Sequence, residues 1–365
     1  MHHSVADRIQ ATGSRTSGFD FLRIGLACAV FVWHLQSTSY GPEFALQTWQ
    51  SAIKSLPTAI LPMFFALSGF LVAGSLERCR TVGYFLYLRA IRIFPALAVE
   101  VLLSALILGP LLTSFAVGAY FTDPLFWRYL LNSIGLISFE LPGVFSDNPF
   151  PNMVNAQLWT VPWELECYIA ISIIGALRIY DSKAVSWAML AALTGAFLIS
   201  WFQGDLPVRH VSGRALVGFF LCGVLFFRLR RAIPYDARLF WICLVVSVIA
   251  TSQTGGGYLA LLPLTYVTVY IGLLTPRVPM FLRLGDYSYG IFLYHFAIQQ
   301  AVVALFPWAT NIWLNGIVSF ALTLICAILS WHIIEKPSLS TRTFGKRMED
   351  RWVARTGRLR PVAGE

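Results

Sequence analysis

Ten long apolar stretches divide this chain of 365 residues, and they constrain its fold more than any other feature. Each is close to the roughly 20 residues that a helix needs to cross a bilayer. Only 12% of the residues are charged, whereas about a quarter are charged in a soluble domain. The stretches are residues 18–38, 57–76, 90–112, 158–177, 185–203, 212–228, 238–253, 257–275, 286–306 and 312–333. The pattern predicts an all-α membrane bundle of about ten transmembrane helices.

The basic residues predict how these helices are oriented. If residues 126–139 form an interfacial or re-entrant segment, the outer segments hold only Lys54, Arg128, Arg209 and Arg214. All other loops and tails that carry basic clusters then lie on the cytoplasmic side, as the positive-inside rule requires. The same rule explains the net charge of +9 without a nucleic-acid partner. We therefore expect two cytoplasmic termini, with an N-terminal tail of residues 1–17, a membrane domain of residues 18–337 and a basic tail of residues 338–365.

The first apolar stretch carries two ionisable residues, Arg23 and His34, which lie eleven positions apart. On a helix this spacing places them within about 20° of the same face and roughly 16 Å apart along the axis. An ionisable group within a bilayer is costly and usually marks a functional site. The structural alternative is a histidine that is hydrogen-bonded between helices. The shared face with Arg23 favours function for His34.

Two arginines, Arg89 and Arg92, lie near the predicted cytoplasmic mouth of the third stretch. They are three positions apart, so on a helix they share a face. Guanidinium groups bind phosphate with two hydrogen bonds each, which suits a phosphorylated ligand from the cytoplasm. The alternative is that both arginines only anchor the helix at the inner surface.

Two acids, Glu164 and Glu166, stand where the fourth stretch begins. Residues two positions apart point to different faces of a helix, so they are not a paired acid and base. A buried Glu164 is suited to orient a histidine or to accept a proton from a hydroxyl. The alternative is that one acid meets a lipid headgroup and the other pairs with Arg209 or Arg214.

Three further features of the apolar stretches remain open. Ser68 and Gly69 interrupt the second stretch with small residues, which usually allow close helix packing but also suit a ligand that passes the backbone. His295 is a second intramembrane histidine, for which we expect a structural role. The six cysteines are scattered through the chain, so no metal site is expected.

Together these motifs resemble the acyltransferase-3 family of integral membrane acyltransferases, which includes O-antigen, exopolysaccharide and Nod-factor O-acetyltransferases. The resemblance covers residues 18–337. The matching motifs are Arg23 with His34, residues 64–71 for FFxxSGFL, Arg89 with Arg92 for RxxR, residues 158–168 for LWSLxVEEQFY, and residues 284–295 for LGxxSYxxYLxH. Pro62 replaces an acid that many members carry, and Leu165 replaces the second glutamate of VEEQ, so only Glu164 carries over.

The resemblance implies transfer of an acyl group, usually acetyl, from cytoplasmic acyl-CoA to a glycan or glycolipid hydroxyl outside a bacterial inner membrane. In that scheme Arg23, Arg89, Arg92 and Ser68 bind the donor. His34 is then a general base or a transient acyl carrier, and Glu164 positions the acceptor or a base. The implied partners are acyl-CoA, a carbohydrate or glycolipid acceptor, the lipid bilayer and possible proteins of a glycan-synthesis complex.

Two other functions fit the same features. A bundle with intramembrane histidine and arginine also suits a transporter or flippase of a glycan or lipid-linked sugar. No inverted repeat with paired broken helices is evident, which speaks against a carrier. A non-catalytic partner in glycan synthesis is the third candidate. For the acyltransferase, we expect His34 to line a cavity that continues to Arg89 and Arg92.

Overall fold

The computed structural model describes residues 4–12, 16–51, 53–177, 182–203, 212–253, 255–277, 285–306 and 311–356. Within these ranges the chain is helical and has only isolated β-bridges in place of strands, which confirms the all-α prediction. Arg209, Leu284, and residues 1–3, 13–15 and 357–365 of the predicted tails lie outside the described residues.

Each of the ten predicted stretches contains a helix. These helices are α2 (Ser17–Tyr40), α4 (Ser55–Arg78), α5 (Val82–Leu103), α9 (Val161–Ala176), α10 (Lys183–Gln203), α11 (Gly213–Arg228), α12 (Ala237–Thr251), α13 (Leu261–Gly272), α14 (Ser288–Leu305) and α15 (Ile312–Ser330). Within the described ranges, six helical segments are long and apolar enough to cross a membrane. The chain is therefore a membrane protein, and the count of ten spans stays a prediction.

Shorter helices connect and extend these elements. They are α1 (Val5–Thr12), α3 (Pro42–Gln50), α6 (Gly109–Leu112), α7 (Val117–Thr122), α8 (Pro124–Leu130), α16 (Lys336–Ser340) and α17 (Arg342–Thr356). The segment predicted to be interfacial or re-entrant, residues 126–139, holds the end of α8 and one turn of 3₁₀-helix, Leu131–Ile134. No helix in that segment is long enough to cross a bilayer.

Helix α5 extends well beyond its predicted stretch. It begins at Val82, where the side chain of Thr81 accepts a hydrogen bond from the Tyr84 backbone N–H at 3.2 Å. Such a cap satisfies one of the free N–H groups of the first turn. Five residues of π-helix, Ser104–Leu108, then join α5 to α6. Pro95 consequently lies inside the helix rather than in its first turn.

The bundle packs tightly where glycines replace larger residues. A Cβ atom added to Gly69 on α4 would lie 1.9 Å from the carbonyl oxygen of Phe220, and one added to Gly223 on α11 would lie 2.1 Å from that of Ala66. Backbones that approach this closely are typical of helix pairs within membranes. Gly69 therefore has the packing role that its sequence context suggested.

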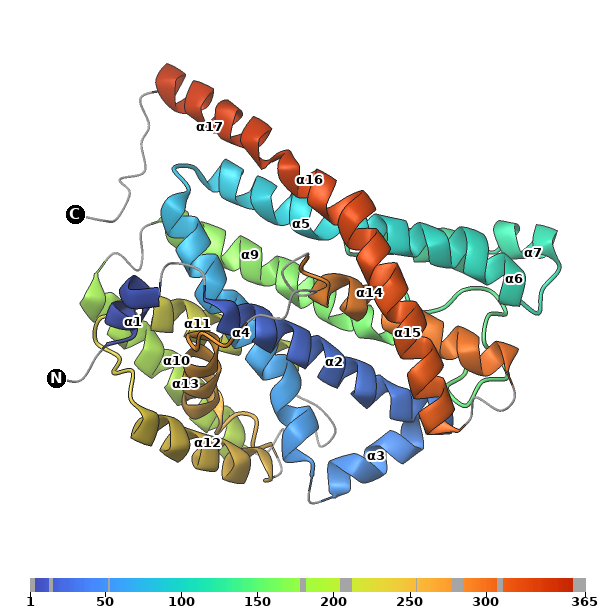
Figure 1. Ribbon diagram of the computed structural model, residues 1–365, viewed down its shortest axis with the longest axis horizontal. Coiled ribbons are helices and arrows are strands. Elements are labelled where there is room, and N and C mark those ends of the chain that lie inside the picture. Colours follow the sequence, from blue (N-terminus) through green and yellow to red (C-terminus); the bar gives the residue numbers. More distant parts are fainter. Residues whose placement is uncertain are drawn as a thin grey trace.

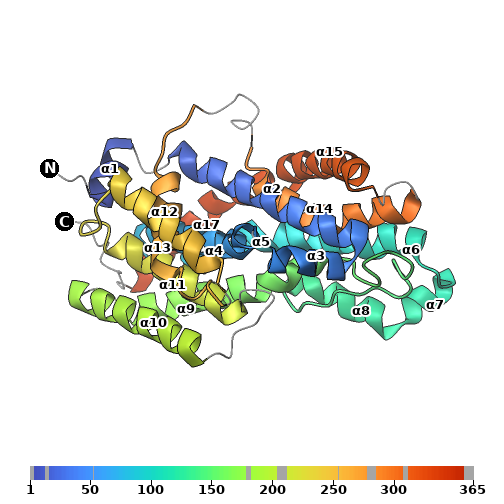
Figure 2. The same cartoon turned by 90° about the horizontal axis from the view of Figure 1, so that it is seen from below.

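The outer helices present apolar side chains to the surroundings. Figure 2 shows α10 on the opposite side of the bundle from α15. Phe202 on α10 is 77% exposed and Ile317 on α15 is 70% exposed, as expected of surfaces that face lipid. In Figure 1, α16 and α17 continue from the end of α15, and both contact α5.

Candidate functional site

Two histidines meet inside the bundle, where α2 packs against α14. His34 Nδ1 lies 2.8 Å from His295 Nε2, and the two rings are stacked with their centroids 5.1 Å apart. The side chain of His295 is fully buried, whereas His34 keeps some exposure. The sequence predicted His34 as a site residue but did not predict its pairing with His295.

The hydrogen bonds determine which ring nitrogens carry protons. His295 Nδ1 lies 3.0 Å from the carbonyl oxygen of Ile291 and 2.9 Å from that of Phe292, which can only accept. His295 Nδ1 must therefore carry a proton, and in the neutral ring Nε2 is an acceptor. His34 Nδ1 then donates to His295 Nε2. In neutral His34 the other nitrogen, Nε2, is left without a proton and can act as a base.

A cavity of about 700 Å³ opens beside this pair, and His34 is part of its lining. Three tryptophans, Trp33, Trp159 and Trp163, contribute to its wall. Within the described part of the chain, the residues that line it include no Asp, Glu, Lys or Arg. Its size is typical of ligand pockets, which are mostly apolar with a few polar groups.

A buried polar network holds one wall of the cavity in place. Gln157 lines the cavity, and its Nε2 donates to the carbonyl oxygen of Leu293 at 2.7 Å. It also donates to Asn155 Oδ1 at 3.2 Å. The Asn155 amide in turn donates to Glu100 Oε1 at 2.6 Å, which also accepts from Ser104. The segment that holds Asn155 and Gln157 is thereby joined to α5 and to α14.

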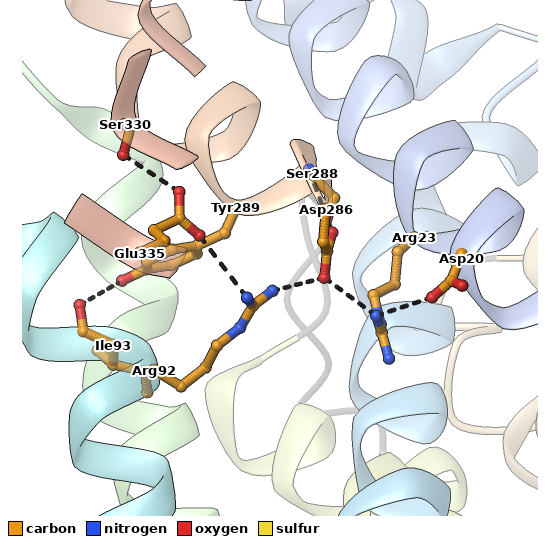
Figure 3. A network of polar contacts seen from close by, with 9 residues as sticks. All are labelled: Asp20, Arg23, Arg92, Ile93, Asp286, Ser288, Tyr289, Ser330 and Glu335. Carbon is orange, nitrogen blue, oxygen red and sulfur yellow. Dashed lines mark hydrogen bonds and ion pairs between the residues drawn. The ribbon is translucent and has the colours of Figure 1, made fainter. Parts of the chain in front are cut away.

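A second polar cluster joins the arginines of α2 and α5 (Figure 3). Asp286 Oδ2 accepts from Arg92 Nη2 at 2.7 Å and from Arg23 Nη1 at 3.1 Å. Asp20 pairs with Arg23 at 3.2 Å, and Glu335 lies 3.6 Å from Arg92. We call these five residues the arginine–carboxylate network. The side chains of Arg23 and Arg92 remain 28% and 24% exposed, so a ligand can reach them.

The charge of Asp286 follows from its two partners. Asp286 lies two residues before α14 begins. Burial alone would raise the pKa of this carboxyl, but the neighbouring Arg92 and Arg23 hold its pKa below the usual value. Asp286 is therefore an anion that balances two cations, one near the start of α2 and one within α5. The spacing of Arg23 and His34 did not predict Asp286 as a partner. Two arginines at one depth in a membrane do, however, require counter-ions.

Arg89 lies apart from the arginine–carboxylate network, although it shares α5 with Arg92. Its guanidinium lies 5.8 Å from the ring centre of Phe85 and 5.9 Å from that of Tyr168. Its Nη2 donates a long hydrogen bond of 3.4 Å to Ser75 Oγ. The Nε atom of Arg89 is buried and has no hydrogen-bond partner among the described residues. Arg89 is thus the arginine of this site with most unused hydrogen-bonding capacity.

Glu164 belongs with Arg89 rather than with His34. The hydroxyl of Tyr168 donates to Glu164 Oε1, and Ser68 is a further hydrogen-bonding neighbour of Tyr168. Since Arg89 lies over the ring of Tyr168, this tyrosine connects three predicted site residues, Ser68, Arg89 and Glu164. Tyr168 itself was missed, although it stands in the motif that contains Glu164. Glu166 is exposed on the other face of α9.

The predicted site residues therefore fall into three groups. His34 lines the cavity with its partner His295 behind it, Arg23 and Arg92 join the arginine–carboxylate network, and Ser68, Arg89 and Glu164 surround Tyr168. The residues that line the cavity include none of the predicted arginines, nor Glu164. The expected continuous lining from His34 to Arg89 and Arg92 is thus not found in this cavity. Among the described residues, no group of three or more His, Cys, Asp or Glu is placed to hold a metal ion.

Comparisons with known proteins match nearly the whole chain. The sequence model of a family described as "Acyltransferase domain" matches residues 16–332. The chain is 28% identical to "Nodulation protein 10" of Rhizobium leguminosarum bv. viciae, over 91% of this chain and 95% of that protein. It is 25% identical to "O-acetyl transferase" of Shigella phage Sf6, over 89% of this chain and 97% of that protein. No solved structure matches the chain.

Proposed function

This chain belongs to the acyltransferase family whose model covers residues 16–332, and we propose that it is an O-acetyltransferase of glycans. In this proposal it moves an acyl group, usually acetyl, from cytoplasmic acyl-CoA to a hydroxyl of a glycan or glycolipid. The acceptor lies on the outer side of a bacterial inner membrane, and both termini are cytoplasmic. The relative named "O-acetyl transferase" supports the choice of an oxygen acceptor and an acetyl group.

One feature carries the proposal: His34 lines the cavity, and the hydrogen-bond pattern leaves its Nε2, the ring nitrogen not used in the contact with His295, without a proton. His34 Nε2 takes the proton of the acceptor hydroxyl while the hydroxyl oxygen attacks the thioester carbonyl. The new C–O bond forms as the C–S bond breaks, and the proton passes from His34 to the departing thiolate. General acid–base work of this kind contributes roughly 10²- to 10⁴-fold in rate. In an alternative route, the acyl group is transferred first to His34 and from there to the acceptor.

The donor is assigned to the arginines. Arg89 has a buried Nε without a described partner, and Arg23 and Arg92 are accessible at their shared carboxylate. Guanidinium groups of this kind are suited to the phosphates of CoA. Ser68 and Glu164 lie with Arg89 around Tyr168, which supports a place for them along the pantetheine arm. In this arrangement Glu164 positions the donor and not the acceptor.

The acceptor is assigned to the cavity beside His34. Its tryptophans offer flat faces on which the C–H faces of sugar rings can stack, and its few polar groups can fix a hydroxyl near His34. The lipid bilayer surrounds the apolar outer helices. Residues 1–17 and 338–365 are proposed as cytoplasmic segments that flank the membrane domain, on the side where other proteins of a glycan-synthesis complex would meet it.

The test uses purified protein in liposomes with acetyl-CoA and a glycan acceptor. We expect release of CoA thiol that requires the acceptor and is lost in His34→Ala. His332→Ala is the matched control, because it removes a histidine of the same bundle that belongs to a different contact. The ring of His332 lies 6.4 Å from that of Tyr287.

Three results would separate the functions. Loss of thiol release in His34→Ala but not in His332→Ala supports the acyltransferase. Movement of the glycan across the liposome membrane without cleavage of the thioester would identify a transporter or flippase. Absence of both activities in the wild-type protein would favour a non-catalytic partner.

An acetyl donor without phosphates tests the role of Arg89. We expect Arg89→Gln to raise KM for acetyl-CoA by roughly 10-fold or more, since a hydrogen bond to a charged group contributes about 1.5–3 kcal/mol. KM for acetyl-pantetheine, which lacks the nucleotide and its phosphates, should not change. An equal rise with both donors would assign Arg89 to the fold or to the thioester end. Arg80→Gln is the control, because Arg80 is 45% exposed and pairs with Asp350 on the surface.

A further inference from the structure

We propose that His295 is the positioning residue of the transfer reaction, which fixes His34 as a base and shares the proton that His34 accepts. This inference rests on the proposed function, because it assigns the second member of the pair that carries it. His295 does not line the cavity, so it acts only through His34.

The orientation of His295 is fixed by its own helix. Its Nδ1–H group points at the carbonyl oxygens of Ile291 and Phe292, three and four positions earlier on α14. The ring lies among aromatic side chains, including Phe31 at 6.1 Å and Phe296 at 6.5 Å between ring centres. A fully buried ring with one nitrogen committed to the backbone presents its other nitrogen, Nε2, in a single direction.

The fixed position of His295 Nε2, which accepts a hydrogen bond, favours one tautomer of His34. Neutral histidine can carry its proton on either nitrogen, and only the form with the proton on Nδ1 leaves Nε2 free as a base. The hydrogen bond of 2.8 Å to His295 Nε2 favours that form before any substrate arrives. In Ser-His-Asp triads a carboxylate has the same orienting task.

The use of an imidazole instead of a carboxylate suits the membrane interior. A carboxylate beside His34 would add a permanent charge, which is costly at this depth unless it is paired. Among the described residues, no carboxylate forms an ion pair or hydrogen bond with either ring. The pair is therefore neutral at rest and holds one extra proton only during transfer. That proton comes from the acceptor hydroxyl, and it is returned to the thiolate of CoA.

Two substitutions separate this role from a purely structural one. Asparagine at position 295 places its amide where Nδ1 lies and can still donate to the α14 carbonyls, but it is too short to reach His34. Glutamine places an amide oxygen near the position of Nε2, where it can accept from His34 Nδ1–H but cannot take up a proton. His295→Asn removes the orienting contact, and His295→Gln restores it.

We expect His295→Asn to lower kcat by roughly 100-fold, which is within the range of general-base effects. KM for acetyl-CoA and for the glycan should stay within about threefold, because His295 contacts neither substrate. His295→Gln should recover at least about tenfold in kcat over His295→Asn, yet remain below wild type. Asn315→Ala is the matched control, since it removes a buried contact between α15 and α2, the 3.0 Å bond to Ser39, without touching either imidazole.

Several outcomes would overturn the inference. A wild-type kcat in His295→Asn would do so, as would a loss expressed only in KM, or a His295→Gln variant no better than His295→Asn. An equal loss of kcat in Asn315→Ala would show that any buried polar contact of α2 has this effect. If His295→Asn does not accumulate in the membrane, His295→Gln decides alone: unchanged KM with kcat reduced about two- to tenfold supports the role, and a wild-type kcat or a larger loss contradicts it.

The assay also separates this inference from the proposed function. If wild type releases no thiol, or His34→Ala keeps full activity, the acyltransferase mechanism itself fails. If His34→Ala is inactive while His295→Asn resembles wild type, only the role of His295 fails.

Discussion

Asp286 is a single carboxylate that binds two arginines from different helices, Arg92 at 2.7 Å and Arg23 at 3.1 Å. Removal of one partner from a buried ion pair leaves the others uncompensated. Because one anion here balances two cations, its loss affects both α2 and α5. The network therefore stabilises the part of the bundle to which the donor is assigned.

We expect Asp286→Asn to lower the free energy of unfolding by about 2 kcal/mol, less than the 3–5 kcal/mol of a fully buried pair because Asp286 keeps 23% exposure. The pKa of Asp286 is lowered in the fold, so its contribution is complete above about pH 4 and is lost as the pH falls through the lowered value. The difference between variant and wild type should thus be the same at pH 6 and pH 8.

Thermal unfolding in detergent measures this difference. Asp350→Asn is the control, because its pair with Arg80 is 51% and 45% exposed and should contribute little. A difference that grows between pH 6 and pH 8 would mean that another group titrates in the network.

At the scale of single residues, the sequence indicated candidate site residues but not the partners that they contact. The costs of burying Arg23 and His34 in a bilayer pointed to both residues. Their partners could not be predicted, because Asp286 and His295 lie more than 260 positions away on a different helix. His295 was expected to be structural, since a lone intramembrane histidine gives no sign of a second ring at 2.8 Å.

At the scale of elements, the backbones of α4 and α11 approach each other closely at Gly69 and Gly223. We expect Gly223→Ala to lower the free energy of unfolding by about 1–3 kcal/mol, since its Cβ would lie 2.1 Å from the backbone oxygen of Ala66 and force the helices apart. The acyltransferase activity of this variant should fall as well, because Ser68, next to Gly69, moves with α4.

The matched control is Gly195→Ala on α10, where a Cβ atom would meet nothing within 4 Å. That variant should be neutral or gain about 0.5–1 kcal/mol, as alanine favours helices more than glycine does. Thermal unfolding of both variants in the same detergent tests the difference. Equal stability of the two would show that α4 and α11 can separate without cost.

The existence of the ten apolar helices could be predicted from the sequence, whereas several of their ends and the shorter helices could not. Apolar stretches reveal where a helix lies in lipid, but α5 continues beyond its stretch to Val82. The reason is tertiary: the backbone N–H of Thr81 donates to Glu349 on α17 at 2.7 Å. The highly charged composition of residues 338–356 predicted only a basic tail, because composition does not reveal the contacts that hold α17 to α5.

At the scale of the whole molecule, the two proposed substrates meet surfaces of opposite character. The donor side presents arginines and carboxylates, whereas the described residues that line the cavity beside His34 include no Asp, Glu, Lys or Arg. A charged group in an uncharged, partly apolar cavity loses hydration without gaining a partner. The cavity should therefore discriminate between acceptors by charge.

We expect neutral oligosaccharides to be acetylated with kcat/KM at least about tenfold higher than the matching oligosaccharides that contain a uronic acid, since one uncompensated charge costs more than 1.4 kcal/mol. The measurement compares pairs that differ only in a carboxylate or its methyl ester. Esterification should restore the rate. A preference for the free acid would place the acceptor elsewhere, beside the arginines.

The arginine–carboxylate network and the cavity share no residue, and this separation has a consequence for the cell's energy supply. A continuous polar channel through the bundle would let protons and salts flow down their gradients whenever the enzyme stood idle. With charged groups at one end and a neutral imidazole pair bounding the other, an acetyl group can be passed between compartments on the arm of its carrier. In the proposed reaction, modification of the acceptor therefore consumes one thioester and leaves the voltage across the membrane intact.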